Sequence, residues 1–235
     1  MIAEYLSQLT ARLEDQLGDR LVAAWVVGSS ALGDFDELRS DVDVQAVSST
    51  RLSRPELERL AGALSHESLP CPARGLEFVL YAQEDLTDPN GPAFSLNLNT
   101  GPRMDHRAGY DPEAEPRFWF TLDVSIASQQ SRRLAGQPAE TVLPPLPREL
   151  VIEAAKEALE FWREYDRGQA ILSACRAWAW AVEGRWLSKG EAAAWATARL
   201  GDPAPVAKAL ARRADPEAPE PTAGEFAAVI AQAAR

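Results

Sequence analysis

Three acidic side chains in the first third of the chain have the types and spacing of a metal-dependent site. Asp41 and Asp43 stand one position apart in DVDVQAV, and Glu77 follows in GLEFVLY. In a β-strand, residues i and i+2 share a face and lie about 6.6–7 Å apart, so Asp41 and Asp43 point together. Two neighbouring carboxylates repel each other and require a cation or open water. Mg²⁺ prefers oxygen ligands of this kind.

Glu77 lies in a segment whose apolar residues alternate. Leu76, Phe78 and Leu80 point to one face, which leaves Glu77 on the other. If this strand neighbours residues 41–47, the three acids converge. Metal ions would then neutralise a triphosphate, while the third carboxylate takes a proton from an attacking hydroxyl.

A glycine-serine turn precedes these acids. The apolar run LVAAWVV at 21–27 ends in Gly28, Ser29 and Ser30. Glycine allows close approach of the backbone to a ligand, and a following helix N-terminus offers N–H groups to an anion. No G-K-[ST] follows, so the turn is not a Walker A loop. Each motif alone also fits an ordinary structure, a solvated strand face for D-x-D and a plain strand-to-helix turn for the Gly-Ser pair.

The elements that must position these residues follow from hydrophobic periodicity. The pattern predicts helices over 3–17 and 53–65 and strands over 21–27, 41–47 and 76–82, whereas 117–128 fits strand or helix. The proline-rich LPPLP at 143–147 marks a boundary. Five helices are expected beyond it, at 148–165, 168–183, 188–200, 204–214 and 223–234. The predicted fold class is therefore α+β, with a sheet-and-helix domain at 1–143 and an all-α helical-bundle domain at 148–235.

Composition narrows the class of protein. The chain has 235 residues, 46% of them apolar, and a formal net charge of −11. This charge argues against a general nucleic-acid binder and suits metal ions or cationic small molecules, although a solvated acidic surface has the same composition. No apolar stretch approaches the roughly 20 residues of a membrane span. The two cysteines and two histidines are too few for a disulfide framework or a zinc site, which fits a cytoplasmic protein.

The order G-S, D-x-D and later strand acid resembles the polymerase-β-like nucleotidyltransferases. More narrowly, the chain is similar to the aminoglycoside adenylyltransferases that modify streptomycin and spectinomycin. The similarity runs almost end to end, through GSSALGDFDELRSDVDVQAV, RGLEFVLY, WFTLDVSIASQQSRRLAGQPA and ILSACRAWAWAVEGRWLSKGEAAAWATARL. The last segment is the most specific, because the wider superfamily lacks it. The resemblance implies an N-terminal nucleotidyltransferase domain with a mixed sheet flanked by helices, and a helical domain that completes the ATP and acceptor sites.

The resemblance also implies a reaction. AMP would pass from ATP to a hydroxyl of an aminoglycoside or aminocyclitol antibiotic, with Mg²⁺ as cofactor and pyrophosphate as the second product. Asp41, Asp43 and Glu77 would hold the metal, and Glu77 would act as the catalytic base. The partners would be ATP and a cationic hydroxylated small molecule, with no nucleic acid or membrane, and the protein would be a monomer.

Six residues are assigned to the nucleotide: Gly28, Ser29, Ser40, Asp123, Arg176 and Lys189. The chain itself supports the two cations. Arg176 borders an apolar stripe and must find an anion or reach water. Lys189 lies in the first turn of a helix, where the macrodipole disfavours a cation. An exposed loop acid, a snorkelling arginine and a solvated lysine are the structural alternatives for Asp123, Arg176 and Lys189.

Trp162 and Asp166 stand where family members stack on and charge-pair with the antibiotic. Core packing is the alternative for Trp162. Two departures from the family bear on the acceptor. The stretch between Trp162 and Arg176 is shorter than in streptomycin-modifying members, and a tyrosine near the nucleotide is replaced at about Ala214. Spectinomycin or another hydroxylated acceptor therefore fits at least as well as streptomycin.

Two other functions remain open. One is a nucleotidyltransferase that acts on a protein or on another small hydroxylated acceptor. The other is a non-catalytic nucleotide-binding regulatory module. Loss of an acid would favour the second, whereas Asp41, Asp43 and Glu77 are all present.

Overall fold

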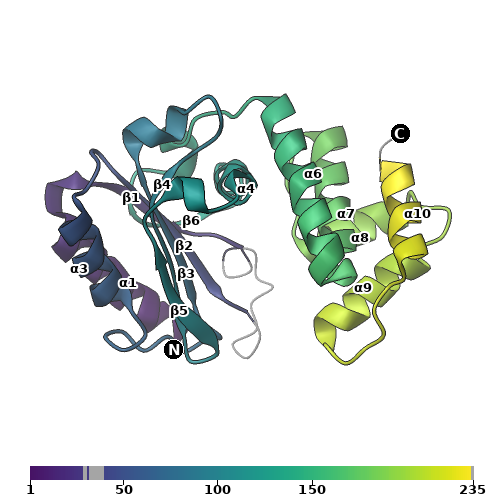
Figure 1. The fold of residues 1–235 in the computed structure, drawn as a ribbon, viewed down its shortest axis with the longest axis horizontal. Helices are drawn as coiled ribbons and strands as arrows, with labels where there is room; N and C mark the ends of the chain where they lie inside the picture. Colours follow the sequence, from purple (N-terminus) through teal and green to yellow (C-terminus); the bar gives the residue numbers. More distant parts are fainter. Residues whose placement is uncertain (29–30, 32–39, 234–235) are drawn as a thin grey trace. The chain divides into compact units, whose positions relative to one another are not determined.

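The structure is a computed structural model that describes residues 1–28, 31 and 40–233. The chain forms two compact units, Met1–Leu146 and Pro147–Arg235, here called the sheet unit and the helical unit. In the described residues, the sheet unit has six strands in one mixed sheet with helices on both faces, and the helical unit contains helices alone (Figure 1). The predicted α+β class is confirmed.

The strands follow the order β5-β4-β3-β2-β1-β6 across the sheet. Their bounds are β1 Leu21–Val26, β2 Val42–Ser48, β3 Leu76–Ala82, β4 Phe94–Gly101, β5 Met104–Gly109 and β6 Arg132–Gly136. Among the described strands, β2 and β3 are the one parallel pair, and the other neighbours are antiparallel. The central parallel pair carries the predicted acids at its beginning.

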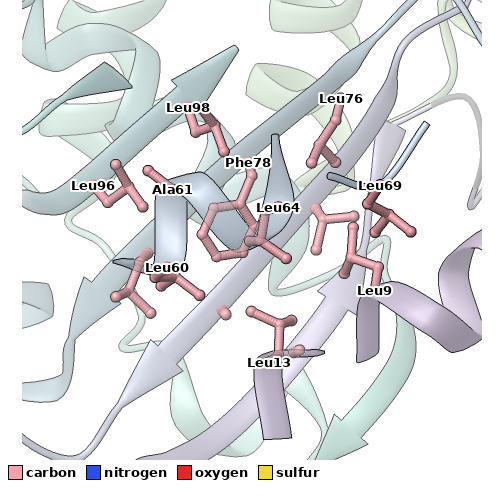
Figure 2. Packing of buried hydrophobic residues seen from close by; sticks show 14 of the residues in the cluster. Leu9, Leu13, Leu60, Ala61, Leu64, Leu69, Leu76, Phe78, Leu96 and Leu98 are labelled. Atoms are coloured by element: carbon pink, nitrogen blue, oxygen red, sulfur yellow. The ribbon is translucent and has the colours of Figure 1, made fainter. Parts of the chain in front are cut away.

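Helices α1 (Ile2–Leu17) and α3 (Arg54–Leu64) cover one face of this sheet (Figure 1). Leu9 and Leu13 of α1 are four residues apart, so they share the helix face that packs on the sheet. The alternating residues of β3 meet them there, and Phe78 is fully buried in the middle of the cluster (Figure 2). The predicted inward face of this strand is therefore confirmed.

Helices α4 (Arg117–Ala127) and α5 (Ala139–Val142) contribute to the core on the other face. The segment 117–128, for which strand and helix were both open, is helical because Phe120, Val124 and Ala127 recur at helical spacing toward this core. The rings of Phe94 and Phe120 lie 4.6 Å apart between centroids. Short 3₁₀ turns at Gly18–Arg20, Gln83–Thr87 and Pro112–Ala114 complete the unit.

The helical unit consists of α6 Arg148–Tyr165, α7 Arg167–Glu183, α8 Lys189–Thr197, α9 Ala204–Ala214 and α10 Ala223–Ala233. Helix α7 packs against the four others and carries much of the core. It ends at Gly184, whose φ of 72° is readily adopted by glycine. A capping box is present at α8, where the side chains of Ser188 and Glu191 accept hydrogen bonds from each other's backbone N–H.

The two cysteines lie in different units, and both are buried free thiols. Burial raises the pKa of Cys71 and raises that of Cys175 to about 12. Within the described ranges, no helix combines the length and apolar character needed to cross a membrane.

Candidate active site

The first part of the site is the beginning of the parallel pair β2–β3. Asp43 and Glu77 are direct partners in the register of these two strands. Their neighbours Val44 and Phe78 point into the core under α1 and α3, so Asp43 and Glu77 lie on the opposite face. Adjacent strands are about 4.8 Å apart, which places the two carboxylates side by side. Glu77 is exposed and can therefore meet a ligand.

Gly28 lies directly against Asp43. The amide N of Val27 donates to the carbonyl of Asp43 over 2.9 Å, which joins the end of β1 to β2. Gly28 has a φ of 62°, and a Cβ built on it would collide with Oδ2 of Asp43. Only glycine leaves room for the carboxylate here. The structure thus brings the predicted glycine turn and the aspartate pair together, while Ser29 lies outside the described residues.

Asp41 immediately precedes β2 and has a cationic partner that the sequence did not suggest. Nη1 of Arg74 donates to Oδ2 of Asp41 over 2.6 Å, and the Asp41 side chain is 17% exposed. The amide N of Arg74 also bonds the carbonyl of Ser40 over 3.3 Å. This contact places Ser40 beside the aspartate pair.

The polar surface continues from Glu77 toward the sheet edge. Asn99 of β4 is the direct partner of Glu77, and Arg107 of β5 is the partner of Asn99. One register step deeper, Nδ2 of Asn97 donates to Glu115 over 2.7 Å, and Glu115 also pairs with Nη2 of Arg107 over 2.7 Å. The sequence reasoning missed these residues, although S-L-N-L-N has the alternation of a strand.

Asp123 lies on α4, so the alternative of an exposed loop acid is wrong. It is partly buried and close to Tyr81. Burial of Tyr81, together with the charge of Asp123, raises the pKa of the tyrosine hydroxyl well above its usual value. Tyr81 is four residues beyond Glu77 along β3, so the structure associates Asp123 with the deeper part of this face.

Arg176 and Lys189 come to one corner of the helical unit, between α7 and α8. Nε of Arg176 donates to the carbonyl of Leu187 over 2.8 Å, two residues before Lys189. The guanidinium carbon lies 5.5 Å from the ring centroid of Trp186. Nζ of Lys189 donates to Oε1 of Gln169 over 2.8 Å. These contacts hold both side chains at the same corner of their own unit.

Trp162 and Asp166 both have structural roles in the helical unit. Trp162 packs against the core cluster of α7 to α10, as its core alternative predicted. Oδ1 of Asp166 caps α7 by accepting from the amide N of Gln169 over 3.1 Å, and lies 3.5 Å from Nε of Arg212. Through Gln169, Asp166 is linked to Lys189.

Comparison with known proteins follows the same division of the chain. Residues 141–233 match the family described as aminoglycoside adenylyltransferase, C-terminal domain. An aminoglycoside (3'') (9) adenylyltransferase of Klebsiella pneumoniae is 27% identical over 210 residues, which cover 85% of this chain and 79% of the relative. A Rhizobium radiobacter protein of the same name is 26% identical over 209 residues, covering 85% and 77%. The chain is therefore similar to the aminoglycoside adenylyltransferases over most of its length.

A solved structure agrees with this family in fold. Spectinomycin adenyltransferase AAD(9) from Enterococcus faecialis, crystallised with ATP and spectinomycin, matches with a TM-score of 0.70 over 99% of both chains, at 16% identity. This match shows the fold, a mixed sheet flanked by helices and a C-terminal helical region. By its similarity to the named relatives, the protein is a nucleotidyltransferase enzyme.

The carboxylates at the start of β2 have the chemistry of ligands for a hard divalent cation. Asp41 and Asp43 offer oxygen ligands from one end of β2, and the absent Cβ of Gly28 makes room for one of them. In the part of the chain that is described, no three acidic, histidine or cysteine side chains are gathered as ligands of one ion. Mg²⁺ requires no such cage, because it commonly binds one or two carboxylates plus substrate phosphates.

Proposed function

We propose that the protein transfers AMP from ATP to a hydroxyl of an aminocyclitol or aminoglycoside antibiotic and releases pyrophosphate. The observation that carries this proposal is the direct pairing of Asp43 with the exposed Glu77 on one face of the sheet, in a chain similar to the aminoglycoside adenylyltransferases. The curated relatives are named for this activity at the 3'' and 9 positions. The solved AAD(9) structure contains ATP and spectinomycin.

Glu77 is assigned as the general base. Its exposed carboxylate takes the proton from the acceptor hydroxyl, and the oxygen then attacks the α-phosphorus of ATP. A new O–P bond forms, the bond between the α-phosphorus and its bridging oxygen breaks, and pyrophosphate carries away that oxygen. A carboxylate at Asp43 beside it would repel the phosphates of ATP, so a cation is required to bring them close.

Asp41 and Asp43 would hold Mg²⁺, with Glu77 at its edge. Bound Mg²⁺ neutralises phosphate charge during the displacement. Gly28 leaves room for the Asp43 carboxylate, and its backbone lies directly beside this proposed metal ligand. Ser29 and Ser40 flank this point in the sequence and complete the assigned phosphate contacts on the sheet unit, and Asp123 on α4 is assigned to the nucleotide site.

The helical unit contributes cations and acceptor contacts in this proposal. Arg176 and Lys189 offer charge-assisted hydrogen bonds to phosphate oxygens, and their neutral partners fix their positions beforehand. Trp162 and Asp166 are assigned to a cationic acceptor, which the acidic composition of the chain favours. Because Asp166 already caps α7 and lies near Arg212, it would charge-pair through its second oxygen.

Spectinomycin is the favoured acceptor. By the resemblance, the segment between Trp162 and Arg176 is shorter than in streptomycin-modifying members. A smaller acceptor requires fewer contacts from this segment. Turnover of streptomycin is expected to be slower than that of spectinomycin.

The test is an adenylylation assay with ATP, MgCl₂ and each antibiotic, read by mass spectrometry of the drug and by release of pyrophosphate. Glu77→Gln should reduce kcat by about 10²- to 10⁴-fold, the range of general-base catalysis, while ATP still binds in calorimetry. Glu84→Gln serves as the control, because Glu84 is a 56% exposed acid paired with Arg51 in the same unit.

Two results would contradict the proposal. Full activity of Glu77→Gln would remove the base from the mechanism. Binding of ATP by the wild type without turnover of either drug would favour a protein acceptor or a regulatory nucleotide-binding module. Labelled AMP found on a co-incubated protein would support the protein acceptor over the regulatory module.

A further inference from the structure

Four adjacent strands present polar side chains in a single row across the sheet. The row runs from Asp43 on β2 through Glu77 and Asn99 to Arg107 on β5, each the register partner of the next. It crosses the beginning of β2 and β3 and the end of β4. Asp43 and Glu77 already have assigned roles in the reaction. Arg107 is paired with Glu115. Asn99 is therefore the member of this row whose role is open.

The orientation of Asn99 follows from its neighbours. Leu96 and Leu98 belong to the core under α1 and α3, so Asn99 projects from the opposite face together with Glu77. Directly opposite residues of an antiparallel pair have Cβ atoms about 4.5–5.5 Å apart. The side chain is partly exposed, and within the described residues its amide makes no hydrogen bond. An amide oriented beside the base is thus open to a ligand.

Asn97 provides an internal comparison. It lies on the same strand and the same face, one register step deeper. Its amide is used within the protein, because it donates to Glu115, whose side chain is 8% exposed and also pairs with Arg107. The two asparagines therefore differ in the hydrogen bonding of their side-chain amides. The amide of Asn97 has a protein partner, and that of Asn99 has none among the described residues.

We propose that Asn99 is an acceptor-binding residue, which holds the acceptor so that its reactive hydroxyl faces Glu77. This assignment rests on the proposed function. A carboxamide both donates and accepts hydrogen bonds, which matches the hydroxyl, amine and carbonyl groups of an aminocyclitol. It carries no charge, so it adds no repulsion beside Glu77 and binds Mg²⁺ or phosphate less strongly than a charged group would. Its partner is accordingly the acceptor.

The experiment compares Asn99→Ala and Asn99→Leu with Asn97→Ala, using spectinomycin as the acceptor. Both Asn99 variants should lower kcat/KM for spectinomycin about 10-fold, mainly through KM, which is the effect of losing one neutral hydrogen bond. The Kd for ATP with MgCl₂, measured by calorimetry, should stay within twofold of the wild type. Asn97→Ala should lower the melting temperature and leave KM for spectinomycin unchanged.

Each other outcome has a defined meaning. If the Asn99 variants keep kcat/KM within twofold of wild type, the residue only lines a solvated face and the assignment is wrong. A parallel loss of ATP affinity would make Asn99 a nucleotide contact and also overturn it. If the wild type adenylylates no antibiotic at all, the proposed function fails and this assignment fails with it. The first two results leave the proposed function intact.

Discussion

The sheet unit and the helical unit hold their candidate site residues by different means. In the sheet unit, backbone ladders fix Asp43 and Glu77, because register alone decides which side chains face each other. In the helical unit, side-chain hydrogen bonds fix Arg176 and Lys189 on the carbonyl of Leu187 and on Gln169. The carboxylates therefore depend on the sheet as a whole, whereas the two cations depend on contacts of their side chains.

The cores of the two units also differ in the size of their side chains. Large side chains fill the sheet unit, and its fully buried residues include Trp25, Phe78 and Tyr81. Small residues dominate the core of the helical unit, where alanines of α7, α8 and α9 meet at close distance. The sheet unit should therefore be sensitive to the loss of volume and the helical unit to its gain.

The largest expected effect is that of Phe78→Ala. Phe78 is fully buried at the centre of the cluster in Figure 2. Its truncation should lower the free energy of unfolding of the sheet unit by about 3–5 kcal/mol, because a cavity remains. Denaturant unfolding followed by circular dichroism measures this change. Val182→Ala in α7 is the control, since Val182 is 63% exposed, and a loss below about 1 kcal/mol for Phe78→Ala would contradict the comparison.

A gain of volume should be the more damaging change in the helical unit. Ala193 of α8 is fully buried, whereas its neighbour Ala194 is exposed on the same helix. Ala193→Leu should cost about 1–3 kcal/mol through overpacking, and Ala194→Leu should be nearly neutral. Thermal unfolding of the two variants side by side gives the difference. Equal melting temperatures would show that the alanine core has room to spare.

The two capping boxes allow a matched test of local positioning. Ser53 caps α3 in the sheet unit, and Ser188 caps α8 just before Lys189. Ser53→Ala and Ser188→Ala should each lower stability by about 1 kcal/mol. Ser188→Ala alone should weaken ATP binding, because it loosens the helix end that carries Lys189. If calorimetry finds the same ATP affinity for Ser188→Ala and wild type, the assignment of Lys189 to the nucleotide site is contradicted.

The smallest expected effect is on stability at acidic pH, and it compares Glu56 of the sheet unit with Glu225 of the helical unit. Hydrogen bonds from Ser53, then from Arg20, lower the pKa of Glu56 to about 2. A hydrogen bond from Lys208, then from the Thr222 amide, lowers the pKa of Glu225 to about 2. Both carboxyls have ordinary values of 4.5, so their contribution is present above pH 4.5 and is lost as pH falls toward 2.

Added salt should change the contributions of these two glutamates to stability by different amounts. Glu225 depends first on Lys208, which is 46% exposed, whereas Glu56 depends first on a neutral serine. Unfolding scans between pH 2 and 5 should show that Glu225→Gln matters less at about 1 M salt, because exposed ion pairs are screened. The effect of Glu56→Gln should change less with salt. Identical salt responses would contradict this assignment of causes.

The sequence allowed the faces of the central strands to be predicted, because alternation in DVDVQAV and LEFVLYA has one physical interpretation. It could not show that Asp43 is opposite Glu77, since register depends on contacts between strands that are 34 positions apart in the chain. For the same reason Arg74 was missed as the partner of Asp41. Nothing local in the chain indicates that these two side chains meet.

Other features that the sequence analysis left out or left open could have been predicted from local sequence patterns. The strand β4 could have been predicted from the alternation S-L-N-L-N, but β5 has mostly polar, exposed residues and little periodicity. The sequence could have indicated a second role for Asp166, besides acceptor binding. An aspartate just before a helix is a preferred N-cap residue, and Asp166 caps α7. Trp162 was open between core and acceptor, and its packing supports the first without excluding the second.

The burial of the two native thiols has a practical consequence for labelling. Thiolates are the reactive form, and burial keeps Cys71 and Cys175 protonated at neutral pH. Maleimide dyes should therefore attach only to cysteines introduced at exposed positions, such as Glu58 on α3 and Glu160 on α6. A donor and an acceptor fluorophore at these sites would follow the separation of the two units, with and without ATP, in an otherwise unaltered chain.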